Sequence, residues 1–310
     1  MMENEQKTLP ARLATIARSL PFIGEGKPTV SVIDFQGAIG AGGGGPGARR
    51  SISHAKFEPV IEAAFKPKNL KAVALSINSP GGSPVQSRLI FQTIRRLATE
   101  KETPVLAFIE DVGASGGYLL AIAADEIFAD ACSIVGSIGV ISAGFGAPEL
   151  LAKWGVERRV YKAGDNKSTL DPFKPEDPED IAHFQTLLDD THDTFINMVK
   201  DRRGTRVDTG YEDTFSGRFW SAPGAKARGL IDDMAQLPSL LRARFGDAVA
   251  IKRFSPSGGS LVSRLTGSGL SAPSRSFGAG GRIGPLAGAV SADDVVTTLE
   301  ERALWAQYGL

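Results

Sequence analysis

Gly113-Ala114-Ser115-Gly116-Gly117-Tyr118 stands between two apolar runs, and this arrangement decides how the chain folds. Val105 to Ile109 predicts a buried strand before it, and the alanine-rich run Leu119 to Ala124 predicts a helix after it. Such a turn presents the serine hydroxyl at a helix N-terminus, where free amides stabilise negative charge. Ser115 is therefore a candidate nucleophile, and the alternative is a glycine turn with a serine N-cap.

The same pattern occurs once more just before this stretch. Ala72 to Ile77 predicts a strand, Asn78-Ser79-Pro80-Gly81-Gly82 a turn, and Pro84 to Ala98 a helix. Two strand–turn–helix units in succession predict an α/β domain with a mainly parallel sheet. Ligands gather at the carboxyl ends of such strands, so we expect both turns to face one crevice.

The glycines of the two turns are candidate oxyanion donors. The amide of Gly116 follows the serine, and Gly81 or Gly82 exposes a second amide with no side chain in the way. The alternative for the upstream turn is a plain Pro-Gly connection between a strand and a helix.

The remaining sequence divides into four parts. Residues 1–27 form a tail with one amphipathic helical pattern, and residues 28–254 carry the α/β domain. Residues 255–290 are a linker rich in Gly, Ser and Pro, and residues 291–310 predict a C-terminal helix. A loop with seven glycines, Gly37 to Gly47, lacks the ending of a phosphate-binding loop and is expected to be an active-site or subunit-contact loop.

Further elements are expected within the α/β domain. Ile138 to Ile141 and Glu157 to Tyr161 predict short strands. Asp177 is a suitable N-cap for a long helix that continues to about Arg202, with an apolar stripe for the core or a partner subunit.

Composition excludes several classes of function. The 310 residues have a formal net charge of zero, so no global field favours nucleic acid. Cys132 is the one cysteine of the sequence, which excludes an intramolecular disulfide and fits a cytoplasmic location. We expect its thiol to be buried and inert. No stretch approaches the roughly 20 apolar residues of a membrane span. The N-terminal pattern allows peripheral contact with the inner membrane, although packing on the protein itself is favoured.

The general base is harder to identify. The three histidines are His54, His183 and His192. His183 and His192 fall on the long predicted helix and not in a loop near the serine, so a Ser-His-Asp triad stays open but has little support. No metal-binding motif is present, so neither a metal nor another cofactor is expected. A lysine can act as base when burial lowers its pKa, and Lys162 and Lys167 follow a predicted strand end.

Six motifs in this order resemble the signal peptide peptidase A family of serine peptidases. The resemblance covers about Val30 to Asp233, and its motifs are Asn78-Ser79-Pro80-Gly81-Gly82, Gly113-Ala114-Ser115-Gly116-Gly117-Tyr118, Gly136-Ser137-Ile138-Gly139-Val140, Lys162-Ala163-Gly164-Asp165-Asn166-Lys167, Gly217-Arg218-Phe219-Trp220-Ser221-Ala222 and Ala227-Arg228-Gly229-Leu230-Ile231-Asp232.

The resemblance implies a ClpP/crotonase-like fold of repeated ββα units and a Ser-Lys dyad. By motif, Ser115 matches the nucleophile, Lys167 the general base, and Gly116 with the Gly81-Gly82 turn the oxyanion amides. It also implies peptide substrates, such as signal-peptide remnants or short unfolded segments. A homo-oligomeric ring or dome is implied as well, with active sites sometimes shared between subunits.

Two other functions remain open. The first is a crotonase-type enzyme for acyl-CoA thioesters, with Glu110 and Asp111 as acid/base groups near the serine turn. The second is a catalytically silent, ring-forming scaffold, for which Ser115 and Lys167 would be superfluous.

Overall fold

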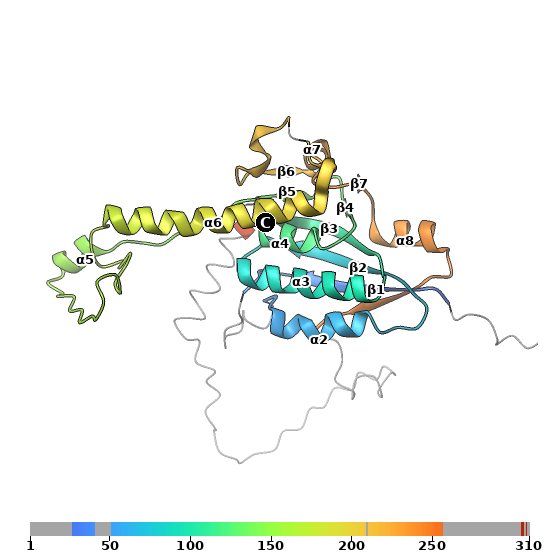
Figure 1. The fold of residues 1–310 in the computed structure, drawn as a ribbon, viewed down its shortest axis with the longest axis horizontal. Coiled ribbons are helices and arrows are strands. Elements are labelled where there is room, and N and C mark those ends of the chain that lie inside the picture. Colours follow the sequence, from blue (N-terminus) through green and yellow to red (C-terminus); the bar gives the residue numbers. More distant parts are fainter. Residues whose placement is uncertain (1–26, 41–50, 209, 257–304, 307, 309–310) are drawn as a thin grey trace, which may run out of the picture.

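The computed structural model describes residues 27–40, 51–208, 210–256, 305–306 and 308, which are built around one sheet (Figure 1). The strands of this sheet are β1 (Thr29–Gln36), β2 (Leu70–Ser79), β3 (Val105–Ala114), β4 (Glu126–Ala129), β5 (Ile134–Gly136), β6 (Phe219–Ser221), β7 (Asp233–Met234) and β8 (Ala250–Phe254). The helices are α2 (His54–Ala64), α3 (Pro84–Glu100), α4 (Gly116–Ala121), α5 (Pro148–Lys153), α6 (Pro178–Arg203), α7 (Ala222–Ala227) and α8 (Leu237–Phe245).

The strand pairing brings the two glycine turns together. The order is β6-β5-β3-β2-β1-β8, with β4 between β3 and β7, and every pair is parallel except β5 with β6. The register of β2 against β3 shifts after Ile77, so that Ser79 lies opposite Gly113. The predicted α/β class with a mainly parallel sheet is confirmed, and both turns lie at neighbouring strand ends.

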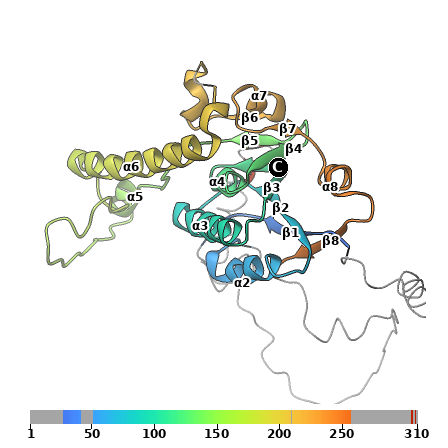
Figure 2. The same cartoon turned by 45° about the vertical axis from the view of Figure 1, so that its right-hand side comes forward.

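The sheet buries apolar side chains on both of its faces. Helices α2, α3 and α4 cover one face and α8 packs on the other (Figure 2). Strand β1 shows why: Ile33 and Phe35 belong to the core under α2 and α3, while Val30 and Val32 belong to the core under α8. This alternation follows from the two-residue period of a strand.

Helix α6 begins as expected but packs along only part of its length. The Asp177 side chain accepts a hydrogen bond from the amide of Glu179 (2.9 Å), which confirms the predicted N-cap. The buried residues of α6 are Phe195, Val199 and Arg203, all in its C-terminal half.

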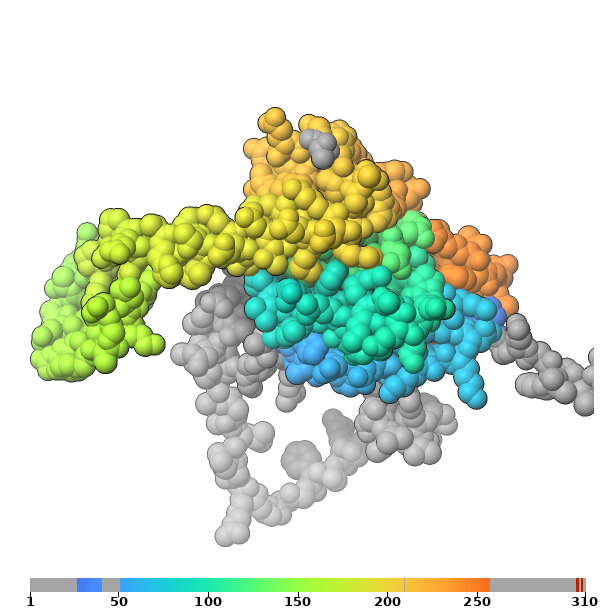
Figure 3. All heavy atoms as spheres, viewed as in Figure 1, coloured from blue at the N-terminus to red at the C-terminus, as the bar shows by residue number. Residues whose placement is uncertain are grey.

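Residues 141–190, which we call the arm, project from the body of the molecule (Figures 1 and 3). They include α5 and the N-terminal half of α6. The arm exposes large apolar side chains, namely Ile141, Phe145, Leu150, Trp154, Val156, Tyr161, Phe173, Ile181 and Leu187. Apolar side chains that gather outside a core indicate a surface for another protein molecule.

Two predicted strands were wrong. Ile138 to Ile141 forms no strand, and β5 at Ile134–Gly136 takes the place beside β3. Glu157 to Tyr161 lies in the arm, where no strand of the described residues is available to pair with it.

The domain limits at 27/28 and 254/255 lie at the borders of the described residues. The N-terminal tail and linker therefore fall outside them, apart from Lys27, Ser255 and Pro256. Of the predicted C-terminal helix only Trp305, Ala306 and Tyr308 are described. In the described part of the chain, no helix is both long enough and apolar enough to cross a membrane.

Candidate active site

Ser115 sits on a strained turn between β3 and α4. Its backbone has φ 51° and ψ −122°, outside the conformations that a serine normally adopts. Its amide donates to the carbonyl of Gly136 (2.9 Å), which ties the turn to the end of β5. Strain of this kind persists where surrounding contacts hold it, and it occurs often at active sites. The turn lifts the Ser115 hydroxyl out of the sheet at the first turn of α4.

The Gly81-Gly82 turn lies directly against this serine. A Cβ on Gly81 would fall 2.7 Å from the Ser115 Cβ and 2.8 Å from the Gly116 nitrogen. A Cβ on Gly82 would fall 2.1 Å from the Ile39 carbonyl oxygen. Both glycines have positive φ, 103° and 135°, so glycine is required by conformation as well as by space.

The amides of the three predicted oxyanion glycines differ in their partners. The Gly81 amide donates to Ser79 Oγ (3.2 Å) inside the protein. The amides of Gly82 and Gly116 take part in no hydrogen bond among the described residues. Gly82 and Gly116 are therefore the pair with amides available to a ligand, while Gly81 provides the space between the turn and the serine.

Helix α4 is anchored firmly to the core. The buried Tyr118 hydroxyl donates to the Leu230 carbonyl (2.7 Å), and burial raises the pKa of this tyrosine. Leu230 in turn lies in the stretch of residues 227–232 that the sequence analysis singled out. This stretch fixes the helix whose first turn carries Ser115.

A cavity of about 1000 Å³ opens beside Ser115. Its walls come from the Gly82 turn and α3, from Ser115 and α4, from residues 137–141, and from α6. Leu119, Val140, Phe195 and Met198 give the cavity an apolar part, and Arg88, Asp189 and Asp190 add charged groups to its lining. A groove of this size and character accommodates an extended peptide with apolar side chains.

The C-terminal part of the chain reaches the same cavity. Tyr308 is buried, lines the cavity, and meets the ring of Phe219 edge-on at 4.9 Å. Burial raises its pKa, and a hydrogen bond with Ser137 lowers it by less. The sequence analysis assigned no place to this residue, because nothing in the local pattern indicates which surface a distant segment meets.

The structure does not bring the two predicted catalytic side chains together within one chain. Lys167 is exposed in the arm and does not line the cavity that contains Ser115. The alternative base, Lys162, is also exposed in the arm, where its Nζ donates to the Asp165 carbonyl. Neither arm lysine lines the cavity of Ser115 among the described residues.

His192 was missed by the sequence analysis. It lines the cavity together with Ser115, from the point where α6 leaves the body. The helical spacing offered a signal for its position. Leu188 and Phe195 lie one turn away from His192 on each side and therefore share its face of the helix, and both line the cavity. His183 is exposed on the arm, and His54 bonds to Thr93 away from the site.

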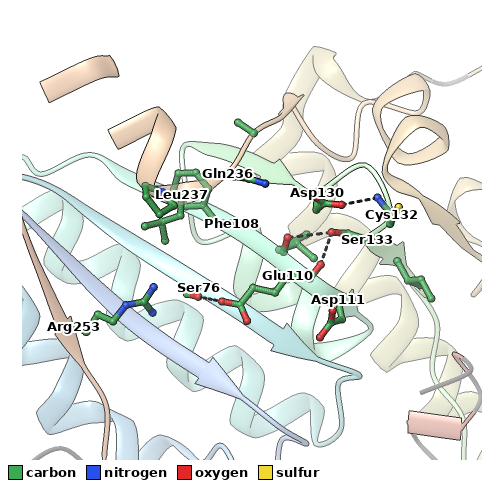
Figure 4. Close-up of a pocket in the computed structure, with 14 residues that line it drawn as sticks. Ser76, Phe108, Glu110, Asp111, Asp130, Cys132, Ser133, Gln236, Leu237 and Arg253 are labelled. Carbon is green, nitrogen blue, oxygen red and sulfur yellow. Dashed lines mark hydrogen bonds between the residues drawn. The ribbon is translucent and has the colours of Figure 1, made fainter. Parts of the chain in front are cut away.

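A second cavity, of about 450 Å³, lies on the side of the sheet that carries α8 (Figure 4). Glu110 and Asp111 line it, and Glu110 accepts a hydrogen bond from Ser76. Neither acid lines the cavity of Ser115. Cys132 also borders this second cavity and is exposed, so the predicted burial of its thiol was wrong.

Comparisons with known proteins show the family of this chain. The family model of peptidase family S49 matches residues 98–244. A putative protease of Synechocystis sp. (PCC 6803) is 31% identical over 212 residues, which cover 68% of this chain and 72% of that protein. A Brucella abortus protein named Na(+)/H(+) antiporter NhaA is 45% identical over 306 residues, 98% of this chain and 39% of that protein.

The chain belongs to peptidase family S49. The resemblance to the signal peptide peptidase A family is thereby confirmed, because relatives that carry the SppA name are among the matches. A solved structure of the membrane-bound stomatin-specific protease 1510-N with a substrate peptide is 17% identical and has a TM-score of 0.48, covering 78% of this chain and 99% of that one. The chain spans 39% of the length of the Brucella relatives.

Proposed function

We propose that this chain is a serine peptidase that hydrolyses peptides through an acyl-enzyme at Ser115. The observation that carries the proposal is the strained Ser115 turn with the unpaired amides of Gly82 and Gly116 beside it. A nucleophile next to two convergent donors is the arrangement that acyl transfer requires. Membership of family S49 supports the same reaction.

The reaction proceeds in two steps. Ser115 Oγ attacks the scissile carbonyl while a base takes its proton, and the amides of Gly82 and Gly116 stabilise the oxyanion. The C–N bond then breaks, and the proton passes to the leaving amine. Water attacks the resulting ester, the C–Oγ bond breaks, and the serine recovers its proton.

We infer that Lys167 is the base and that a second copy of the chain supplies it. Two observations support this: Lys167 lies in the arm, outside the cavity of its own chain, and the arm exposes many apolar side chains. Docking of the arm on a neighbour would bury these side chains. It would also exclude water from the amine, which lowers a lysine pKa toward the range of a base.

The lining of the cavity favours apolar peptide substrates. Leu119, Val140, Phe195 and Met198 offer apolar surface to a substrate side chain, while the charges of the lining come from Arg88, Asp189 and Asp190. Signal-peptide remnants and short unfolded segments have suitable chemistry, because both are extended and rich in small or apolar residues.

The position of the acids weighs against the crotonase alternative. Glu110 and Asp111 line the cavity on the α8 side of the sheet (Figure 4) and do not line the cavity of Ser115. A catalytically silent scaffold would not require the strained Ser115 turn or the two amides beside it.

A serine-directed probe tests the proposal. Ser115→Ala should abolish labelling by a fluorophosphonate and cleavage of fluorescein-labelled casein, because the Oγ nucleophile is gone. Ser239→Ala, an exposed serine on α8, is the matched control and should label like the unaltered protein. Labelling that survives in Ser115→Ala would contradict the assignment.

A further inference from the structure

Residues 136–141, which we call the strap, form one wall of the cavity beside Ser115. Ser137, Gly139, Val140 and Ile141 line the cavity. The first residue, Gly136, accepts the hydrogen bond from the Ser115 amide. The strap therefore borders both the nucleophile and the space that a substrate would occupy.

The strap has little support from the sheet. Strand β5 ends at Gly136, and the following residue, Ser137, has a left-handed φ of 53°. A non-glycine residue in this conformation costs about 1–2 kcal/mol, so contacts nearby must hold it. Two such contacts come from the segment before β6. The Arg218 carbonyl accepts a hydrogen bond from the Ser137 amide (2.7 Å), and the Gly217 amide donates to the Ile138 carbonyl (3.1 Å).

Tyr308 adds a hydrogen bond with Ser137, and a further contact comes from a side chain of α6. His192 Nε2 lies 3.0 Å from the same Ile138 carbonyl. A carbonyl oxygen only accepts hydrogen bonds, so Nε2 carries the proton. This bond joins the strap to α6 where the helix leaves the body, and the imidazole also faces the cavity.

We propose that His192 is a positioning residue for peptide binding in this cavity. Its Nε2–H fixes the Ile138 carbonyl and keeps the strap at the distance from the Gly82 turn that an extended peptide needs. The proposal rests on the proposed function. His192 acts on the wall that holds the substrate, so its loss weakens ground-state and transition-state binding alike, which raises KM more than it lowers kcat.

Two substitutions separate the hydrogen bond from the shape of the ring. His192→Phe keeps an aromatic ring but has no donor, whereas His192→Gln places an amide N–H at nearly the same reach as Nε2. His54→Phe is the matched control, because it loses a bond of similar length, 2.9 Å to Thr93, away from the cavity. A quenched fluorogenic octapeptide with Ala and Leu around the scissile bond serves as substrate.

The expected result is a split between binding and chemistry. His192→Phe raises KM about tenfold, the effect of one lost hydrogen bond, and changes kcat by less than about threefold. The rate of Ser115 labelling by the small fluorophosphonate stays within about twofold, because the probe does not extend along the strap. His192→Gln returns KM to near the value of the unaltered protein, and His54→Phe leaves it there.

A binding assay keeps the inference testable apart from catalysis. In the Ser115→Ala background, the same peptide with a fluorescent label should bind about tenfold more weakly when His192→Phe is added, by fluorescence anisotropy. Equal affinity would overturn the role of His192, as would a Gln variant as weak as the Phe variant, or no peptide binding at all. Loss of labelling in the unaltered protein would instead contradict the proposed function, and the anisotropy result would still decide the role of His192.

Discussion

Gly81 is the glycine at which an added Cβ would meet the side chain of the nucleophile itself. A methyl group there would approach the Ser115 Cβ to 2.7 Å, and its φ of 103° is unfavourable for alanine. We expect Gly81→Ala to reduce kcat/KM at least about 100-fold and to lower the free energy of unfolding by about 1–3 kcal/mol. Steady-state peptide cleavage and urea unfolding measure the two effects.

Gly155 provides the matched control for this prediction. It also has a positive φ, 69°, but a Cβ would meet nothing within 4 Å. Gly155→Ala should therefore lower the free energy of unfolding through its backbone conformation, while peptide cleavage stays at the level of the unaltered protein. If both variants lose activity equally, the contact with Ser115 is not the reason.

At the scale of residues, the sequence predicted one half of the candidate site. Ser115 and Gly116 are neighbours in the chain, and Gly82 follows an adjacent parallel strand, so a local pattern was enough to place them together. Lys167 lies about 50 residues further along, in the exposed arm. No pattern along one sequence shows where this segment lies relative to Ser115.

Helix α6 is held to the body by one buried ion pair. Arg203 is almost fully buried and donates to the Asp232 carboxylate at 2.8 and 3.1 Å. Arg203 also donates to the Gly229 carbonyl, so it clamps the end of α6 to the segment that anchors Tyr118. Without Arg203, Asp232 keeps its longer pair with Arg206 (3.3 Å) but loses both short bonds, and we expect Arg203→Ala to cost about 3 kcal/mol in unfolding experiments. Arg96→Ala breaks an exposed pair with Glu100 and should cost less than about 0.5 kcal/mol.

The same pair predicts a pH dependence. Burial raises the pKa of Asp232, but hydrogen bonds from Arg203 and from the Ile127 amide outweigh burial, so the pKa lies below its ordinary value. A carboxyl group with a lowered pKa stabilises the fold above about pH 4 and loses this contribution as the pH falls through the folded-state value. Urea unfolding between pH 3 and pH 6 should therefore show a shallower acid decline for Asp232→Asn than for the unaltered protein. Identical slopes would contradict this role of Asp232.

At the scale of elements, the sequence predicted the strands and helices that pair with or pack on an element close to them in the sequence. Strands β2 and β3 and helix α3 follow from local hydrophobic patterns and short connections. Val156 and Val160 carry a similar apolar pattern, yet they lie in the arm without a neighbouring strand. A β-branched segment becomes a strand only when another backbone can satisfy its amides and carbonyls.

The described residues form a packed body and an arm whose large apolar side chains are exposed. Trp154 is 71% exposed and Phe145 is 96% exposed. If the arm docks on a second copy, Phe145→Asp with Trp154→Asp should shift the protein toward the monomer in analytical ultracentrifugation. The monomer of the double variant should unfold at the same denaturant concentration as the monomer of the unaltered protein, because neither side chain is part of the core. Gln92→Asp, on the exposed side of α3, is the control and should leave the assembly intact.

A site shared between copies makes a stronger prediction, because two inactive variants should restore one another. Ser115→Ala still supplies Lys167 from its arm, and Lys167→Ala still supplies Ser115 from its body. When equal amounts are unfolded and refolded together, random assembly should place an intact serine beside an intact lysine at about a quarter of the sites. Casein cleavage by the mixture should then reach about a quarter of the unaltered rate, whereas each variant alone stays inactive. A mixture as inactive as its parts, with mixed assemblies verified by affinity tags, would mean that each chain must use a base of its own.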